Sequence, residues 1–563
     1  MKFSTSSSNL AFGLSSDPGA VPLLIGVIGH RDPQPSAIPH ILKRFDLLLQ
    51  QIIQACPSTP IWMLNGLAEG MDMIAAEIFL RRVRLARGGN NNDEERVSFD
   101  KLVAVLPKNR NEYLEDFDRN EAQQRVRQLL QVSSFIVEPS NTPELRHDFG
   151  NTPSEPECYA IQGDFIAKYS YFLFAFFNGV DNRYMGGTGH TLAIHRGEIH
   201  PLFRSIDEIL DSREYGESIV IATPRISLQA RRITTQLNHS DAGFSDRAMA
   251  TIQFLDSLNR PLDNLSLVFP RLHESEATFT RLWSYSDSFA KFHKNRYQKI
   301  ATLLVLVGFI LVATADLYDK AAALGWGLVL VAFGIFPRIQ RKLRRPFLAY
   351  RCLAESLAIQ YIWSANHIKA NVADLLFSHR SHDIDNIRMI LRAVAFQLML
   401  GDHCVGSDDD PPLSQSRLWI NGQIEFLGRR IKTFSLLARC WKRVAYLFAG
   451  AGIFTAALQL LPFGIEPPEV VVNTLLAGFA SSLAYQELMG YEQTHERYQI
   501  SLRQFERANQ ALHYLETRDF CCVEASNDLA DRYKLVLKAI GREKIDELNE
   551  WMSKQLERSY QPS

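Results

Sequence analysis

Two pairs of long apolar segments in the second half of the chain constrain its fold more than any other feature. Each segment is about 16 to 19 residues long and almost free of charged residues, which is near the lower limit for a helix that crosses a bilayer. The sequence therefore predicts two transmembrane helical hairpins, at residues 300–337 and 444–488. The alternative is that these segments are buried core helices of a large soluble protein, because single segments of this length are ambiguous.

The charges around the hairpins predict their orientation. Basic residues flank the first hairpin on both sides, with Lys299 before it and Arg338 after it, whereas its connecting loop carries Asp316 and Asp319. Lysine and arginine concentrate on the cytoplasmic side of membrane proteins. We therefore expect an integral membrane protein whose N-terminus, 338–443 segment and C-terminus are cytoplasmic.

The first part of the chain, residues 21–270, alternates strand-like and helix-like segments. Uninterrupted apolar runs such as residues 22–28, 102–106 and 171–177 are typical of strands that are buried on both faces. The alternation predicts an α/β domain with a doubly wound, parallel, Rossmann-like sheet. Residues 1–20 are rich in serine and are expected to form a disordered lead.

Three of the predicted strand-to-helix turns contain glycine and polar residues. In doubly wound folds, ligands bind outside the carboxyl ends of the strands, where glycine lets backbone N–H groups approach a phosphate. These turns therefore predict a phosphate or nucleotide site. The candidate ligand-binding residues are Gly29, His30, Arg31, Asn65, Gly66, Glu69, Gly70, Asp72, Gly186, Gly187, Thr188, Gly189 and His190.

The side chains of these turns suit different contacts. Arg31 is the expected phosphate partner, because a guanidinium group donates two parallel hydrogen bonds. His30 is interpreted either as a ligand contact or as a capping or packing residue. Glu69 and Asp72 would repel a phosphate, so we expect them to contact a ribose or a base, or to cap a helix.

Four motifs in this region resemble the successive motifs of SLOG-type domains, Rossmann-like nucleotide sensors related to the LOG nucleoside-monophosphate hydrolases and the DprA proteins. The motifs are GVIGHRD, LNGLAEGMDMIAAE, LPKNRNEYLEDF (Leu106–Phe117) and GGTGHTLAIHRG, and the resemblance covers roughly residues 21–230. It implies a small nucleotide or dinucleotide as the ligand. LOG enzymes follow their glycine turn with a threonine and a catalytic acid, where this chain has His190, Leu192 and Ala193. We therefore predict no catalytic residue, which favours sensing over catalysis.

The second half of the chain repeats one pattern, in which a basic aromatic helix, an apolar hairpin and a polar helix follow one another. We divide it into a first helical unit at residues 271–400, a loop at 401–422 and a second helical unit at 423–563, which ends in long C-terminal helices. The segment after the first hairpin resembles that of SLATT domains, two-helix membrane effectors that are often associated with SLOG sensors. The resemblance rests on Tyr350, Arg351, Ala354, Glu355, Leu357, Gln360 and Trp363. It implies a homo-oligomeric effector in the inner membrane of a bacterium.

The remaining features argue against several classes of function. The seven cysteines are scattered and include no Cys-x-x-Cys pair, and the acidic segment 407–412 is too tightly spaced for a calcium loop, so no disulfide framework and no metal site is predicted. The net charge is −1 and no basic face is evident, which argues against nucleic-acid polymers as partners. The apolar arms carry no ionisable residue, which argues against a transporter and implies that a conducting path needs several chains.

Together these features predict a membrane-anchored sensor and effector. A small nucleotide-derived signal, and no other cofactor, binds the N-terminal domain and triggers an oligomer rearrangement that permeabilises or disrupts the membrane. The SLOG and SLATT resemblances imply a role in antiviral defence, with the lipid bilayer and further copies of the chain as partners. Two alternatives stay open: a membrane-tethered N-glycosidase that acts on NAD or nucleoside monophosphates, and a membrane scaffold whose Rossmann-like domain has no ligand.

Overall fold

The computed structural model describes most of the chain, which divides into two compact units. An α/β unit is formed by Ser16–Phe279 and Asn371–Val405, and a helical unit is formed chiefly by Thr280–Ala370 and Gly406–Ser563. The described residues are 20–87, 99–141, 153–180, 184–197, 216–226, 244–259, 278–313, 345–368, 370–376, 382–401, 412–459, 468–518 and 526–557. The expected disordered lead therefore lies outside the described residues, apart from Ala20.

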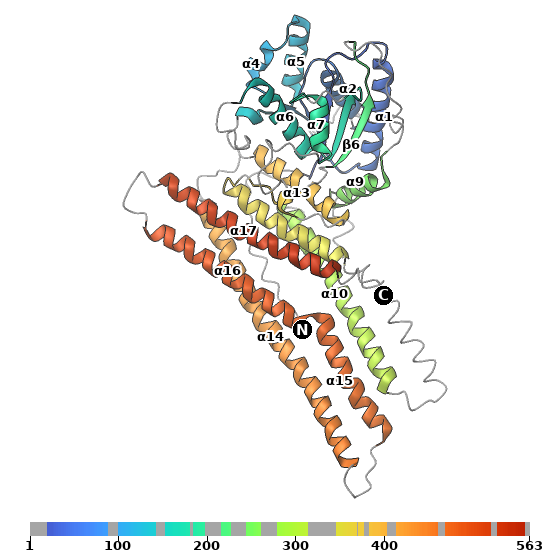
Figure 1. The fold of residues 1–563 in the computed structure, drawn as a ribbon, viewed down its shortest axis with the longest axis vertical. Coiled ribbons are helices and arrows are strands. Elements are labelled where there is room, and N and C mark those ends of the chain that lie inside the picture. Colours follow the sequence, from blue (N-terminus) through green and yellow to red (C-terminus); the bar gives the residue numbers. More distant parts are fainter. Residues whose placement is uncertain are drawn as a thin grey trace, which may run out of the picture. The chain divides into compact units, whose positions relative to one another are not determined.

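A parallel sheet of six strands forms the centre of the α/β unit (Figure 1). Its strands are β1 (Leu23–Gly29), β2 (Ile61–Asn65), β3 (Lys101–Val105), β4 (Phe135–Val137), β5 (Phe172–Phe177) and β6 (Glu217–Ala222). Their spatial order is β4-β3-β2-β1-β5-β6. The predicted α/β class and parallel sheet are therefore confirmed, and the order runs outward in both directions from β1, as in a doubly wound sheet.

Helices connect the strands and bury their apolar residues. They are α1 (Ile38–Ala55), α2 (Met71–Arg87), α4 (Arg110–Glu115), α5 (Asn120–Val132), α6 (Glu155–Tyr169), α7 (Thr188–His195) and α9 (Asp246–Asn259), with a 3₁₀ turn at Pro139–Asn141. Every residue of β5 is apolar and buried, and Phe45 of α1 packs edge-on against Phe174 and Phe176. This burial of successive residues is what the uninterrupted apolar runs predict.

Two helices that follow the first apolar hairpin in sequence belong to the α/β unit. They are α12 (Val372–Leu375) and α13 (His382–Gly401). Asp374 pairs with Lys168 of α6 at 2.9 Å, and the ring of Phe396 contacts Trp62 of β2 with 6.2 Å between centroids. The expected first helical unit, 271–400, is thus divided in the structure, because these side chains find their partners on the sheet domain.

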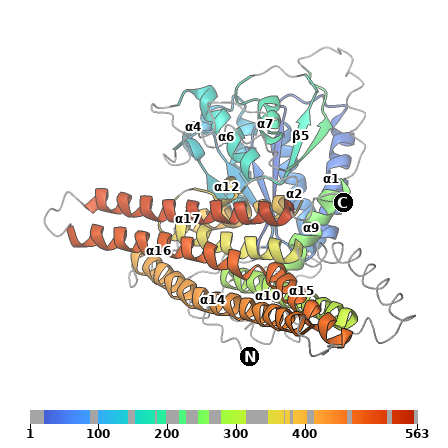
Figure 2. The ribbon, with the colours of Figure 1, turned by 60° about the horizontal axis from the view of Figure 1, so that its bottom comes forward.

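The helical unit consists of long helices, several of which run side by side. They are α10 (Thr278–Ala313), residues 345–365, α14 (Pro412–Gln459), α15 (Glu469–Met489), α16 (Tyr491–Arg518) and α17 (Ser526–Glu557). Helix α14 packs against α15 and α16, and α16 packs against α17 (Figure 2). Helix α14 begins at Pro412, inside the segment 401–422 that the sequence predicts as a loop.

The structure does not support the expectation of two transmembrane hairpins. In the described part of the chain, one helix, Leu282–Ala313, is long and apolar enough to cross a membrane, and most of its apolar stretch is not buried. The second arm of the first hairpin, 321–337, lies outside the described residues. Both arms of the second hairpin are helical, within α14 and α15, but neither of these helices passes the same test over its described residues.

Candidate functional site

The strand order reverses between β1 and β5, so a crevice is expected where these two neighbours end. His30 follows β1 and Asn178 follows β5, and Nε2 of His30 accepts a hydrogen bond from the backbone N–H of Asn178 at 3.1 Å. The imidazole also packs against the ring of Phe177. Burial, and then the charge of Arg225, lowers the pKa of His30. The structure thus places a neutral, buried His30 at the base of this edge, which favours its interpretation as a packing residue.

Arg31 is exposed beside the buried His30. Its guanidinium carbon lies 5.3 Å from the centre of the Tyr159 ring, near the start of α6. The Tyr159 hydroxyl donates a hydrogen bond to Asp116 at 2.7 Å, and Lys108 pairs with the same carboxylate at 2.9 Å. No carboxylate lies within ion-pair distance of Arg31 among the described residues. A cation that lies over an aromatic ring and forms no ion pair is suited to an anionic ligand.

Asp72 lies beneath two of the glycine turns, in the first turn of α2. Its two carboxylate oxygens are 3.3 Å from the points where β-carbons on Gly29 and Gly66 would stand. Burial raises the pKa of Asp72 to about 7, and the charge of Arg31 opposes this rise. A residue that is buried in this way cannot reach a ribose without a rearrangement of the turns. The structure therefore favours the other role expected for Asp72, that of an acidic residue which stabilises the N-terminus of a helix, here α2.

The turn after β2 is held by its own side chains. Asn65 accepts a hydrogen bond from the backbone N–H of Leu67 at 2.6 Å and donates one to the carbonyl of Asp72 at 2.9 Å. These bonds hold Leu67 at a positive φ of 54°. The buried side chain of Asn65 is thus used within the turn, whereas Glu69 is half-exposed at its rim and lies 3.8 Å from Arg119.

Two glycines allow these turns to approach their neighbours. Gly70 has a φ of 95°, and a β-carbon on it would lie 2.4 Å from the carbonyl oxygen of Arg31. Gly186 has a φ of 76°, and its β-carbon would lie 2.6 Å from Cβ of Tyr159. Only glycine adopts such angles without strain and leaves room for these contacts. Tyr159 therefore connects Arg31 of the first turn to Gly186 of the third.

The third turn leads directly into α7. Gly187 precedes the first residue of this helix, and Thr188, Gly189 and His190 form its first turn. The backbone N–H of Gly186 donates a hydrogen bond to Nδ1 of His190 at 3.3 Å. His190 is thus engaged with the turn itself, at the amino end of α7, which is the end of a helix that favours anions.

The three predicted turns lie at one edge of the sheet, because the carboxyl ends of parallel strands face the same way. Their binding of a ligand stays a prediction. Several residues at this edge are absent from the candidate set, namely Lys108, Tyr113, Asp116, Tyr159 and Asn178. Tyr113 donates a hydrogen bond from its hydroxyl to the carbonyl of Gly66 at 2.9 Å, and Lys108, Tyr113 and Asp116 all lie within the motif Leu106–Phe117. Tyr159 and Asn178 carry no comparable signal in the sequence.

Within the residues that the structure describes, no three His, Cys, Asp or Glu side chains are grouped so that they could hold a metal ion. No protein-family model and no curated protein matches the chain. The resemblance to SLOG and SLATT domains therefore rests on the motifs alone.

Proposed function

We propose that this protein is a membrane-associated sensor whose α/β unit binds a small phosphate-bearing ligand, a nucleotide or dinucleotide, at the carboxyl edge of its sheet. The observation that carries the proposal is the position of Arg31. It is an exposed cation that forms no ion pair among the described residues, although its charge interacts with that of the buried Asp72. It stands at the reversal of strand order, and glycine turns close in beside it. In doubly wound sheets this is the place where nucleotides bind.

Helix α6 offers a route from the ligand to the rest of the chain. Tyr159 lies near the amino end of α6 beneath Arg31, and Lys168 lies near its other end, about 14 Å away at the helical rise per residue. There Lys168 pairs with Asp374, and the ring of Tyr169 contacts Phe396 of α13 at 5.2 Å. A ligand that displaces Tyr159 would therefore move α12 and α13, because α6 is a continuous helix.

The same helices are joined by the chain to the helical unit on both sides. Residues 345–365 precede α12, and α14 follows α13. A shift of α13 would thus pull on both neighbours without any non-covalent contact between the two units. We propose this pair of helices as the element through which ligand binding changes the packing of the helical unit.

We further propose that the helical unit acts in a membrane through the two hairpins. Large apolar side chains are exposed on three of its helices, which is expected of surfaces that contact lipid or another subunit. They are Leu303, Leu306, Val307 and Ile310 of α10, Tyr446, Leu447, Ile453 and Phe454 of α14, and Val471, Val472, Leu476 and Leu483 of α15. With the flanking charges, this supports a homo-oligomer in a bacterial inner membrane whose N-terminus, 338–443 segment and C-terminus are cytoplasmic. By its SLOG and SLATT resemblance, it would permeabilise that membrane in antiviral defence.

Calorimetry with the full-length protein in detergent against a panel of nucleotides and dinucleotides tests the proposal. Arg31→Ala should weaken binding about tenfold or more, because it removes a charge-assisted contact with phosphate. Arg84→Ala is the matched control, since Arg84 is exposed near the far end of α2 and lies away from the carboxyl edge. Absence of binding to every nucleotide of a broad panel would instead favour the scaffold.

Asp72 is the specific observation that favours a second candidate, an N-glycosidase, in which the turns would have to rearrange so that this buried carboxyl group reaches the ribose. A buried carboxyl group whose pKa is near 7 is typical of a general acid or base at an active site. If the protein is such an enzyme, purified protein should release a free base from a nucleoside monophosphate, or nicotinamide from NAD. Asp72→Asn should abolish that release while Arg84→Ala retains it. Ligand binding without any product would exclude the enzyme.

A further inference from the structure

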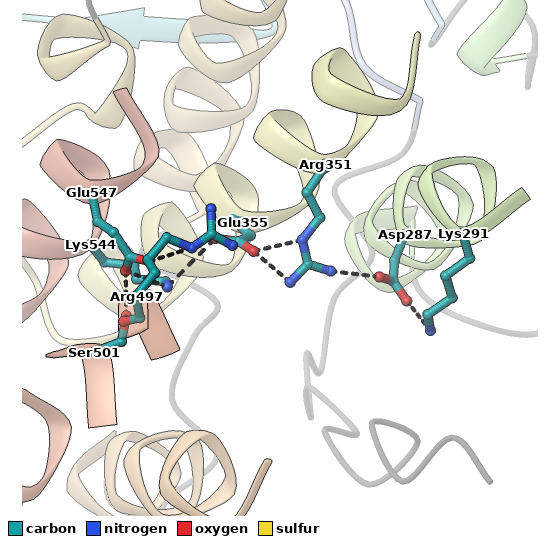
Figure 3. A network of polar contacts seen from close by, with 8 residues as sticks. All are labelled: Asp287, Lys291, Arg351, Glu355, Arg497, Ser501, Lys544 and Glu547. Carbon is teal, nitrogen blue, oxygen red and sulfur yellow. Dashed lines mark hydrogen bonds and ion pairs between the residues drawn. The ribbon is translucent and has the colours of Figure 1, made fainter. Parts of the chain in front are cut away.

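A network of ion pairs lies within the helical unit (Figure 3). Glu355 accepts a hydrogen bond from Nε of Arg351 at 2.6 Å. Asp287 of α10 pairs with the same arginine at 3.2 Å and also with Lys291. Each of these two carboxylates is therefore neutralised by Arg351 and by cations beside it.

The third carboxylate of the network is on α17. Glu547 lies 3.2 Å from Arg497 of α16 and 2.8 Å from Lys544, and it accepts a hydrogen bond from the hydroxyl of Ser501 at 2.6 Å (Figure 3). Lys544 is also 3.9 Å from Glu355, which joins the two halves of the network. All three carboxylates are thus already engaged by basic side chains.

Two further cations adjoin this network without a carboxylate partner in the described part of the chain. Lys294 follows Asp287 by two helical turns on the same face of α10, and it interacts electrostatically with Arg351, Arg430 and Arg497. Arg430 of α14 lies over the ring of Phe426 rather than beside an acid. The network therefore contains more positive charge than its carboxylates neutralise.

Three of the basic side chains affect the same group, the hydroxyl of Tyr498 on α16. Burial by itself would raise the pKa of the Tyr498 phenol, but Arg497, Lys294 and Arg351 outweigh burial and lower that pKa. The Tyr498 ring also contacts Phe434, which is one turn from Arg430 on α14. The guanidinium carbon of Arg497 lies 5.3 Å from the centre of the Tyr498 ring, and the charges that act on Tyr498 come from three helical segments: α16, α10 and residues 345–365.

We propose that Lys294, Arg351, Arg430, Arg497 and Tyr498, the Lys294 cluster, bind a phosphate group. An uncompensated positive charge that is withdrawn from water is costly, and an anion between these side chains would remove that cost. Phosphate suits the cluster because arginine and lysine donate several charge-assisted hydrogen bonds to it, and the tyrosine hydroxyl supplies a neutral donor. The cluster lies in the helical unit, so this site is separate from the proposed ligand site of the α/β unit.

Either a soluble phosphate ester or the headgroup of an anionic lipid could carry this phosphate. Lys294 lies about 12 Å along α10 from Thr302. The Thr302 hydroxyl is 3.3 Å from that of Tyr485, and the Tyr485 ring contacts Trp441 at 4.5 Å. Tyrosine and tryptophan concentrate at membrane interfaces. If these aromatic residues mark the interface, the cluster lies on its aqueous side, which favours a soluble ester.

The test compares melting temperatures of the full-length protein in detergent in inorganic phosphate and in chloride at equal ionic strength. All variants carry Arg31→Ala as well, so that the proposed α/β site does not contribute. Phosphate should stabilise this parent, and Lys294→Gln or Arg430→Gln should each lower the phosphate affinity about tenfold. Arg429→Gln is the matched control, because Arg429 is exposed and pairs with Glu425 at 3.4 Å. It should retain the response to phosphate.

A second arm identifies the source of the phosphate. The same proteins are placed in lipid discs of phosphatidylcholine alone or of an equimolar mixture with phosphatidic acid. Stabilisation by phosphatidic acid that is lost in Lys294→Gln and Arg430→Gln would assign the cluster to a lipid headgroup, and stabilisation by inorganic phosphate alone would assign it to a soluble ester. If neither anion stabilises the parent, or if both variants respond as the parent does, the proposal is wrong. If Lys294→Gln fails to fold, the response of Arg430→Gln to the two anions tests the proposal by itself.

Discussion

Lys168 and Asp374 lie 2.9 Å apart. In the sequence they are separated by the last part of the sheet domain, by α10 and by the first apolar hairpin. Burial by itself would raise the pKa of Asp374, but Lys168 and Arg392 outweigh it and lower that pKa. The pair fixes α12 to the end of α6 within the α/β unit. This is the contact through which we propose that ligand binding reaches the helical unit.

Replacement of the lysine should separate sensing from output. Lys168→Met should cost about 1–3 kcal/mol of stability, because Asp374 loses one of its two partners in a largely buried position. Ligand affinity, measured by calorimetry, should stay within about threefold of the parent, whereas ligand-dependent dye leakage from proteoliposomes should fall. Lys43→Met, at an exposed position of α1, should change neither property. Unchanged leakage in Lys168→Met would remove α6 from the proposed route.

The turn glycines should be intolerant of a side chain. Gly70→Ala should destabilise the α/β unit by about 1–3 kcal/mol, since φ is 95° and the new β-carbon would lie 2.4 Å from a backbone carbonyl oxygen. Gly428→Ala is the control: this glycine lies within α14 with no neighbour within 4 Å, so alanine should raise stability by up to about 1 kcal/mol. Thermal melting of both variants measures the difference. Equal effects would contradict the close approach at Gly70.

Stability should depend on pH through Asp72. Its pKa is about 7 in the folded protein and 3.8 in the unfolded chain, so the folded state binds the extra proton between these values. The contribution of Asp72 to stability is therefore present below pH 3.8 and is lost as the pH rises towards 7, by up to about 4 kcal/mol at 1.36 kcal/mol per pKa unit. Asp72→Asn should be more stable than the parent at pH 8, and this advantage should shrink at pH 5. Melting curves at the two pH values give the comparison. A constant difference would show that the carboxyl group does not titrate in this range.

A charge placed in α10 tests whether the membrane surrounds it. Gly308→Asp should block insertion, at a cost of about 2.5–3.5 kcal/mol for an acid near the bilayer centre. Gly422→Asp is a matched change, because both glycines are helical and neither has a neighbour within 4 Å. Gly422 lies well before the apolar part of α14 and should tolerate the acid. Membrane fractionation and dye leakage report the outcome, and equal behaviour of the two variants would mean that α10 does not cross the bilayer.

The proposed topology can be tested with thiol reagents that do not cross membranes. Cys440 is exposed on α14, in the basic region before the second hairpin, and should be protected from labelling in sealed cells. Tyr318→Cys, in the loop of the first hairpin, should be labelled from outside. Permeabilised cells provide the control, because Cys440 should then react. Labelling of Cys440 in sealed cells would reverse the orientation.

The sequence by itself determined the elements whose signal is local. Uninterrupted apolar runs such as 22–28 and 171–177 identify strands that are buried on both faces, because such strands carry no polar face. Parallel strands end at one edge, so the motifs that follow them indicate which turns share that edge. The apolar stretch from residue 300 likewise indicates a helix that could cross a membrane.

Only the tertiary structure decided which of these elements are partners. It placed Tyr159 beneath Arg31 and Asn178 beside His30, and it placed Phe396 of α13 against the α/β unit instead of the helical unit. Hydrophobic periodicity specifies which face of a helix is buried but not the surface that buries it. That choice depends on the fit of side chains brought together by the whole fold. The apolar face of α13 therefore gives no sign in the sequence that it packs against α6 and α9 of the α/β unit.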